Sequence, residues 1–350
     1  MNCCVNCFAD IQLQEQIKSI SNTTGNCDFC LSLNVVIVDC DLLADTFEDI
    51  FTLYEPIGNS SKLIHEHLKD YWIGLFNPNL SINNVKQLVN TIGRSCSIYS
   101  KELFETPVEF QAHIIDESAK TLELQWETFA TELKENNRFF LNDTIDLEFI
   151  KANLERLAKT YYPDKLFYRS RIGNSRLPIS QLGKPPKENA TSGRANPEGI
   201  PYLYLSDSVD TTIYETRSSL YDRLTVGVFK LNGPLQVITL NKIEELSPFE
   251  IKEKGFELEE FINIRPYLLK LQSELSKPIR KQDSSLDYLP TQYLCEFIKL
   301  NGFDAIEYKS AMHSGGYNLA VFNDDHFECI DSLFIDVTDL KYEYIEVTTP

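Results

Sequence analysis

Three side chains that could act together on an anionic sugar derivative lie close together in the sequence. Arg194 follows a glycine in a run of turn-forming residues, and Tyr204 lies in a short aromatic and apolar run typical of a buried strand. The polar residues 206–208 can cap a helix that carries Glu215. Such a turn–strand–helix unit could direct a guanidinium, a phenol and a carboxylate into one cleft. That set suits an anionic ligand and a positive charge developing on a sugar, although each residue is also an ordinary choice for its element.

Composition excludes some classes of function. The 350 residues are enough for two domains, and 43% of them are hydrophobic, which supports a sizeable core. The net charge of −19 is spread along the chain and disfavours a nucleic-acid substrate, because phosphate backbones require a basic surface. We find no apolar run of membrane-spanning length and no signal peptide, so we expect a cytoplasmic protein without a membrane partner.

Two CxxC pairs near the start of the chain predict a metal site. Cys4 and Cys7 form the first pair, and Cys27 and Cys30 form the second. This spacing is typical of a four-thiolate zinc site, which has no open position and is therefore structural. Cys3 is a spare residue that could compete as a ligand. The alternative is a group of buried free cysteines, since nine cysteines without a secretory signal indicate reduced thiols or metal ligands.

Hydrophobic periodicity divides the chain near residue 160. Residues 1–158 read as an α-helical domain with a small zinc unit in about the first 35 residues, and residues 159–350 read as an α+β domain. The helices expected in the first part are at residues 41–54, 61–76, 83–92, 121–140 and 146–161. In the second part we expect strands at residues 166–171, 202–205, 225–229, 235–239, 305–309 and 317–322, and helices at 256–276 and 289–301.

Other common sites are missing from the sequence. No G-x-G-x-x-G follows a strand and no P-loop is present, so Rossmann and kinase-type phosphate cradles are unsupported. Ser310 lacks the G-x-S-x-G context of a serine hydrolase, and His313 has no base spaced to form a relay with it. His65 and His67 point to different faces of a helix and do not form a metal pair.

Several segments, in this order, resemble the RES-domain family over about residues 160–325. They are L-F-Y-R-S-R at 166–171, G-K-P-P-K-E-N-A-T-S-G-R-A-N-P-E-G at 183–199, Y-L-S at 204–206, Glu215, and Y-K-S-A-M-H-S-G-G-Y-N-L at 308–319. The family is named for an Arg, a Glu and a Ser, which correspond here to Arg169 or Arg194, Glu215 and Ser310. One departure is Ala195, where many shorter members have Trp.

The first half of the chain is similar to the zinc-containing helical segment found ahead of RES domains in longer members. A helical domain of this kind is also found in HEPN-type ribonucleases, which carry an Arg with a His a few residues downstream. No such pair occurs in this sequence. We therefore expect regulation, partner binding or self-association from this half, and no cleavage of RNA.

The resemblance implies a fold related to ADP-ribosyltransferase toxins and activity on NAD. RES proteins degrade NAD by phosphorolysis or hydrolysis and often act as toxins paired with an antitoxin. Glu215 would stabilise the oxocarbenium-like transition state. Arg169 and Arg194 would bind the pyrophosphate, and Tyr204 would stack on the nicotinamide or the ribose. The substrate would be oriented by hydrogen bonds from Ser310 and Asn318.

Two further classes of function remain open at this point. An ADP-ribosyltransferase would share the first half of the chemistry and pass the ADP-ribose to a macromolecule. A binding or scaffold protein would carry a degenerate site, which the intact Arg, Glu and Ser set disfavours. The sequence leaves open whether water or phosphate attacks, which antitoxin or regulatory protein binds, and whether the chain forms homo-oligomers.

Overall fold

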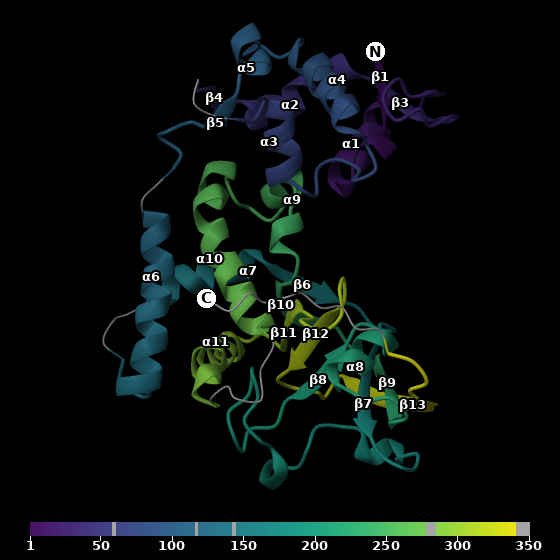
Figure 1. Ribbon diagram of the computed structural model, residues 1–350, viewed down its shortest axis with the longest axis vertical. Helices are drawn as coiled ribbons and strands as arrows, with labels where there is room; N and C mark the ends of the chain where they lie inside the picture. The colour runs from purple at the N-terminus through teal and green to yellow at the C-terminus, as the bar shows by residue number, and fades with distance from the viewer. Residues whose placement is uncertain (58–60, 116–117, 142–144, 278–284, 341–350) are drawn as a thin grey trace, which may run out of the picture. The chain divides into compact units, whose positions relative to one another are not determined.

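The structure is a computed structural model that describes residues 1–57, 61–115, 118–141, 145–277 and 285–340 (Figure 1). Its contacts define two compact units. The first contains Met1–Leu124 and Lys242–Leu269, and the second contains Gln125–Asn241 and Lys270–Pro350. The sequence predicts a domain boundary between residues 158 and 159. The division into compact units does not test that boundary, which stays a prediction. Among the described residues, no helix has both the length and the apolar character needed to cross a membrane.

The first unit combines helices with two small sheets. Its helices are α1 (Ile11–Ile20), α2 (Ala44–Phe51), α3 (Ile64–Tyr71), α4 (Ile82–Gly93), α5 (Lys101–Glu105) and α9 (Pro248–Glu253). One sheet has the order β1 (Asn2–Cys4), β3 (Val35–Asp39), β2 (Thr24–Gly25), and the other pairs β4 (Tyr54–Pro56) with β5 (Val108–Phe110). The helix expected at 41–54 is shorter than predicted, because its last residues leave the helix and form β4.

Asp10 holds the start of α1 against the segment that leads into α9. Its carboxylate accepts a hydrogen bond from the backbone N–H of Leu13 at 2.5 Å and another from the Ser247 hydroxyl. Burial raises the pKa of Asp10 to about 6, the Leu13 N–H opposes this, and the nearby charge of Glu250 raises the pKa further. A cap that stabilises the helix is thus combined with a carboxylate that is costly to ionise.

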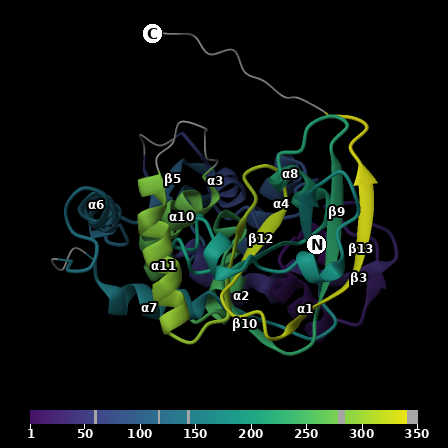
Figure 2. The same cartoon turned by 90° about the horizontal axis from the view of Figure 1, so that it is seen from below.

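The second unit contains one mixed eight-stranded sheet. Its strand order is β13-β9-β7-β8-β12-β11-β10-β6, in which β10 and β11 are parallel and the other neighbours are antiparallel. The strands are β6 (Ala158–Tyr161), β7 (Leu166–Ile172), β8 (Leu203–Ser206), β9 (Arg223–Leu231), β10 (Leu235–Leu240), β11 (Ala305–Lys309), β12 (Tyr317–Val321) and β13 (Phe327–Asp336). The chain is therefore of mixed α+β class. Figures 1 and 2 show β9 and β13, its two longest strands, side by side.

One face of this sheet supplies the core of the unit. Side chains alternate between the two faces of a strand, so residues two apart share a face. Leu203 and Leu205 of β8, Leu319 of β12 and Phe167 of β7 are each at most 1% exposed and belong to one apolar cluster. The opposite faces of the same strands are left for polar side chains, among them Ser206 and Asn318.

The remaining helices of the chain are α6 (Ser118–Thr131), α7 (Leu147–Arg156), α8 (Val209–Glu215), α10 (Leu258–Ser276) and α11 (Leu289–Leu300). Two sequence predictions were wrong in extent. The helix expected at 146–161 ends with α7, and its last residues form β6, which pairs with β10. No strand was expected after residue 322, yet β13 follows, with a register shift between Cys329 and Asp331 that interrupts the alternating pattern.

Helix α8 is capped at its start and fixed to the sheet at its middle. Ser208 caps it by accepting a hydrogen bond from the N–H of Thr211 at 3.1 Å, as the polar run before it predicts. In β7, the Ser170 N–H donates to Thr212 Oγ1 at 2.9 Å, and the Ser170 hydroxyl donates to the Thr212 carbonyl at 2.8 Å. Because α8 packs on β7, β8 and β9, its last residue, Glu215, has a defined position.

The raised pKa of Asp10 predicts a pH-dependent stability. The folded protein binds this proton more tightly than the unfolded chain, so the contribution is complete below the unfolded value of 3.8 and is lost as the pH rises through about 6. Relative to Asp10→Asn, which keeps a capping oxygen, the wild type should lose about 1–3 kcal/mol of unfolding free energy between pH 4 and 7. Urea unfolding at four pH values measures this. Asp45→Asn, at an exposed position, is the control, and parallel pH profiles for wild type and Asp10→Asn would contradict the prediction.

Candidate active site

The carboxylate of Glu215 is bound by two of the other predicted residues. The Ser310 hydroxyl, just after β11, donates to Glu215 Oε1 at 2.6 Å. The side-chain amide of Asn318, in β12, donates to the same oxygen at 2.6 Å. Oε2 makes no hydrogen bond within the part of the chain that the structure describes. The fold thus brings together residues from α8, from the loop after β11 and from β12, and leaves one carboxylate oxygen available to a ligand.

A second layer of hydrogen bonds orients these two donors. The Ser206 hydroxyl of β8 donates to Asn318 Oδ1 at 2.8 Å, which directs the amide N–H₂ group of Asn318 toward Glu215. These two residues are paired across β8 and β12. Ser310 Oγ accepts the backbone N–H groups of Met312 at 3.2 Å and His313 at 3.0 Å, so its single proton is directed to the carboxylate.

The loop from Ser310 to Gly316 is held against α8 by His313. The imidazole Nδ1 lies 2.9 Å from Thr211 Oγ1, and the ring stacks on Tyr214 with centroids 5.0 Å apart and an angle of 6° between the planes. Position 316 must be glycine for this packing, because a Cβ atom there would collide with Thr211 Oγ1 and the His313 ring. The loop that carries Ser310 is therefore fixed on the same helix that carries Glu215.

Tyr204 and Arg194 stabilise the turn before β8 and do not bond to the Glu215 group. The Tyr204 hydroxyl donates to Asn196 Oδ1 at 2.7 Å and accepts the Ala195 N–H at 3.2 Å. Burial raises the pKa of Tyr204. Arg194 Nη1 donates to the carbonyl of Leu275 at 2.6 Å, and the Arg194 carbonyl accepts the hydroxyl of Thr291. Ala195 is fully buried here.

Tyr308 is a buried tyrosine near both groups. It is 5% exposed in β11, directly opposite Asn318 of β12. Burial has the largest effect and raises its pKa, and Tyr204 raises the pKa further. The charge of Arg194 lowers the pKa, and the charge of Glu215 raises it. These three side chains therefore lie within electrostatic range of one buried phenol.

Arg169 lies in β7, opposite Gly227 of β9. Its Nη1 atom is buried and has no hydrogen-bond partner among the described residues. Burial lowers the pKa of Arg169 to about 10, the neighbouring charge of Arg171 lowers it further, and Tyr204 acts in the opposite direction. No hydrogen bond joins Arg169 to Glu215 in the described structure, and its buried Nη1 atom remains a donor without a partner there.

Sequence reasoning missed the supporting residues Ser206 and Thr211 and dismissed His313. Ser206 was expected to help cap α8, but Ser208 does so. His313 was set aside because no base is near it in the sequence, whereas Thr211 reaches it from another element. The two-residue alternation of β8 and β12 carries a signal for Ser206, since it places polar residues of both strands on one face. The Thr211 contact has no comparable signal.

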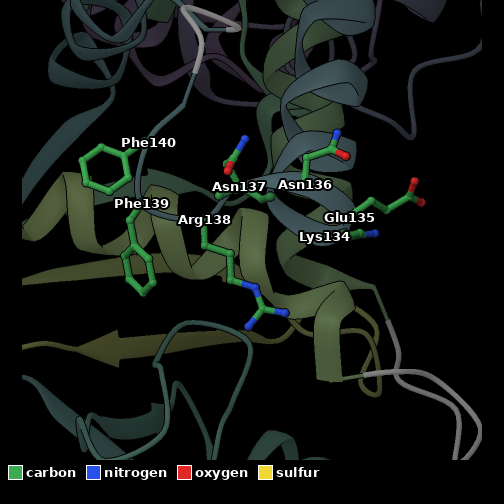
Figure 3. A pocket seen from close by; sticks show the side chains of 8 residues that line it. Lys134, Glu135, Asn136, Asn137, Arg138, Phe139 and Phe140 are labelled. Carbon is green, nitrogen blue, oxygen red and sulfur yellow. The ribbon is translucent and has the colours of Figure 1, made fainter.

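A pocket elsewhere in the second unit contains none of the predicted site residues (Figure 3). It has a volume of about 420 Å³ and is lined by residues 133–140. The two aromatic side chains in it, Phe139 and Phe140, are 90% and 85% exposed. It is a surface feature formed by one short segment and does not collect chemistry from several elements.

The four predicted cysteine ligands meet in the first unit. The sulfur atoms of Cys4, Cys7, Cys27 and Cys30 all lie within 4.8 Å of one another. The Sγ atoms of Cys4 and Cys30 are 3.3 Å apart, and those of Cys7 and Cys27 are 3.4 Å apart. Backbone N–H groups of Phe29 and Cys30 point to Cys27 Sγ, as suits a thiolate ligand. Cys3 is not one of the four. The donor set fits a tetrahedral zinc ion.

The family model named RES domain matches residues 167–344, which contain the whole Glu215 group. The chain belongs to the RES-domain family. In structure, the chain is similar to a chain of the crystal structure of the M. tuberculosis MbcT–MbcA toxin–antitoxin complex, with a TM-score of 0.32 and 16% sequence identity over 54% of this chain and 91% of that chain. No curated protein matches the chain in sequence.

The hydrogen bonds of Asn318 predict a stability effect. Asn318→Ala removes a donor from Glu215 and leaves the buried Ser206 hydroxyl without its acceptor. Leaving such groups unsatisfied should lower the unfolding free energy by about 1–3 kcal/mol. Urea denaturation measures the loss. Asn232→Ala, where an exposed side-chain amide donates to Glu328, should change stability far less, and equal effects of the two substitutions would contradict the assignment.

Proposed function

We propose that this protein degrades NAD by cleaving the bond between nicotinamide and ribose. The observation that carries the proposal is the Glu215 carboxylate, held on one oxygen by Ser310 and Asn318 and open on the other, inside a RES domain. A carboxylate positioned in this way is suited to stabilise positive charge that develops next to it. Its two donors prevent it from rotating away when a ligand binds.

The reaction places that charge on the ribose. The C–N bond breaks, its electron pair moves to the nicotinamide nitrogen, and nicotinamide leaves as a neutral molecule. Positive charge then develops on the anomeric carbon and ring oxygen of the ribose, where Glu215 stabilises it. An oxygen of water or of phosphate forms the new bond, and the attacking group gives any proton it loses to solvent. Attack by water yields ADP-ribose, and attack by phosphate yields ADP-ribose that carries an added phosphate.

The other predicted residues fit binding roles around this step. Arg169, with its free donor, binds the pyrophosphate. Arg194 keeps one donor on the Leu275 carbonyl and offers its remaining donors to the same group. The Tyr204 ring stacks on the nicotinamide or the ribose while its hydroxyl holds the turn. Ser310 and Asn318 orient Glu215 by their hydrogen bonds, and the oriented carboxylate in turn positions the substrate.

NAD loss harms any cell, which suits the role of a toxin. RES proteins often act as toxins that are held in check by an antitoxin, and we propose the same arrangement for this chain. The net charge of −19 favours a restraining partner with a basic contact surface.

Replacing Glu215 with Gln tests the proposal most sharply. Gln keeps the size and much of the hydrogen bonding but removes the negative charge, so turnover should fall by ~10²–10³-fold. NAD affinity should change much less, because the stabilisation exists mainly in the transition state. Nicotinamide release over time gives the rate, and calorimetry gives the affinity.

The matched control is Glu296→Gln, an exposed glutamate of the same unit, which should leave both quantities unchanged. Turnover by Glu215→Gln at the wild-type rate would show that this carboxylate is not the catalytic group. If labelled ADP-ribose from NAD appeared on a macromolecule, the protein would instead be a transferase.

The cysteine cluster is proposed to hold one structural zinc ion. Purified protein should contain about one zinc per chain, measured by elemental analysis. Cys27→Ser should lose the metal and destabilise the first unit, because metal binding and folding are coupled in such sites. Cys329→Ser, a half-buried cysteine outside the cluster, should keep both metal and stability. Metal-free wild-type protein of full stability would contradict the proposal.

A further inference from the structure

Two leucine side chains beside the cysteine cluster lie in solvent. Leu31 directly follows Cys30 and is 75% exposed, and Leu33 is 68% exposed. Both belong to the short segment of residues 31–34 in the first unit, which we call the leucine loop. Large apolar side chains are usually buried, and neighbouring ones that are exposed mark a surface suited to contact with another molecule.

The backbone of Leu31 has a conformation that is unfavourable for leucine. Its φ of 61° lies in the left-handed region, where a Cβ atom comes too close to the following carbonyl oxygen. Asn34 has a φ of 54° in the same loop, but asparagine tolerates this region. The Leu31 side chain is exposed, so burial within the folded chain does not offset the strain. The fold by itself would favour asparagine or glycine at this position, and a contact outside the chain accounts for leucine.

The leucine loop is held in place by the residue between the two leucines, Ser32. The backbone N–H of Cys27 donates to the Ser32 carbonyl at 2.9 Å. The side-chain amide of Asn6 donates to the Ser32 hydroxyl oxygen at 3.3 Å, and Cys30 Sγ lies 3.1 Å from the same oxygen. On the other side of the loop, β3 begins at Val35. A loop fixed at both ends presents its side chains with little further loss of entropy on binding.

The sequence around the leucine loop is acidic. Residues 1–57 contain nine acidic residues and one lysine. Asp28 is exposed in the turn that precedes the loop. A second copy of the chain would bring this acidic sequence against itself, and an anionic lipid surface would also repel it. Charge complementarity therefore favours a partner with basic side chains around the surface that receives the leucines.

We propose that the leucine loop is a docking site for a partner protein that carries an apolar groove with a basic rim. The groove receives the side chains of Leu31 and Leu33, and the rim faces Asp28. The loop lies outside residues 167–344, which match the RES domain, and the proposal does not depend on activity on NAD.

Binding of a designed peptide to the full chain tests the proposal. The probe is a fluorescently labelled amphipathic peptide of leucine and lysine, and the control peptide has glutamate in place of lysine. Fluorescence anisotropy should show that the wild type binds the first peptide and not the second. The double variant Leu31→Asn with Leu33→Asn should bind at least about tenfold more weakly, because two aliphatic side chains are no longer buried. Leu300→Asn, at an exposed leucine of the second unit, should bind like the wild type.

Thermal unfolding separates docking from a role in the fold. Leu31→Asn alone should have a Tm equal to or above that of the wild type, because asparagine tolerates the left-handed region. A marked fall in the Tm of this variant would show that Leu31 stabilises the folded chain, and it would overturn the proposal.

The other outcomes also decide the proposal. A wild type that does not bind the leucine–lysine peptide would overturn it. Equal binding by the double variant would show general attraction between opposite charges and would overturn it as well. Analytical ultracentrifugation and flotation with phosphatidylserine vesicles test the other two occupants. Self-association or vesicle binding that the double variant loses would assign the loop to a second copy or to a membrane, and a basic partner would be ruled out.

Discussion

The structure of the site depends on one acceptor atom, Oε1 of Glu215, which takes hydrogen bonds from Ser310 and Asn318 at 2.6 Å each. These donors come from segments about a hundred residues away in the sequence, so the sheet must form before the carboxylate is oriented. Ser170 fixes α8 to β7 on one side, and His313 fixes the loop after β11 to α8 on the other. The free oxygen of Glu215 is thereby held still, which is the condition for electrostatic catalysis without reorganisation.

The charges of the second unit match those of NAD. NAD carries a positive nicotinamide ring at one end and a negative pyrophosphate in the middle. The unit offers a fixed carboxylate at Glu215, and among the described residues the buried Nη1 of Arg169 and Nε of Arg171 have no hydrogen-bond partner. The buried Tyr308 lies within electrostatic range of Glu215, Arg194 and Tyr204. Under the proposed function, the carboxylate and the guanidinium groups would bind opposite charges of one ligand.

The sequence predicted local structure better than it predicted contacts. The polar run before α8 predicted its cap, and the short aromatic and apolar run at residues 202–205 predicted a strand. The meeting of Glu215, Ser310 and Asn318 came from the family resemblance, because sequence spacing does not determine which strands are neighbours. The contact between Thr211 and His313 was missed for that reason. β13 was missed because its irregular register weakens the period-two pattern.

The most direct test of the account is to incubate the purified protein with NAD, with and without phosphate, and to identify the products by mass. The account predicts free nicotinamide in both cases. It also predicts ADP-ribose where water attacks, or ADP-ribose carrying an added phosphate where phosphate attacks. NAD that remains intact under both conditions, in a folded protein, would contradict the claim that Glu215 is the centre of a site that cleaves NAD.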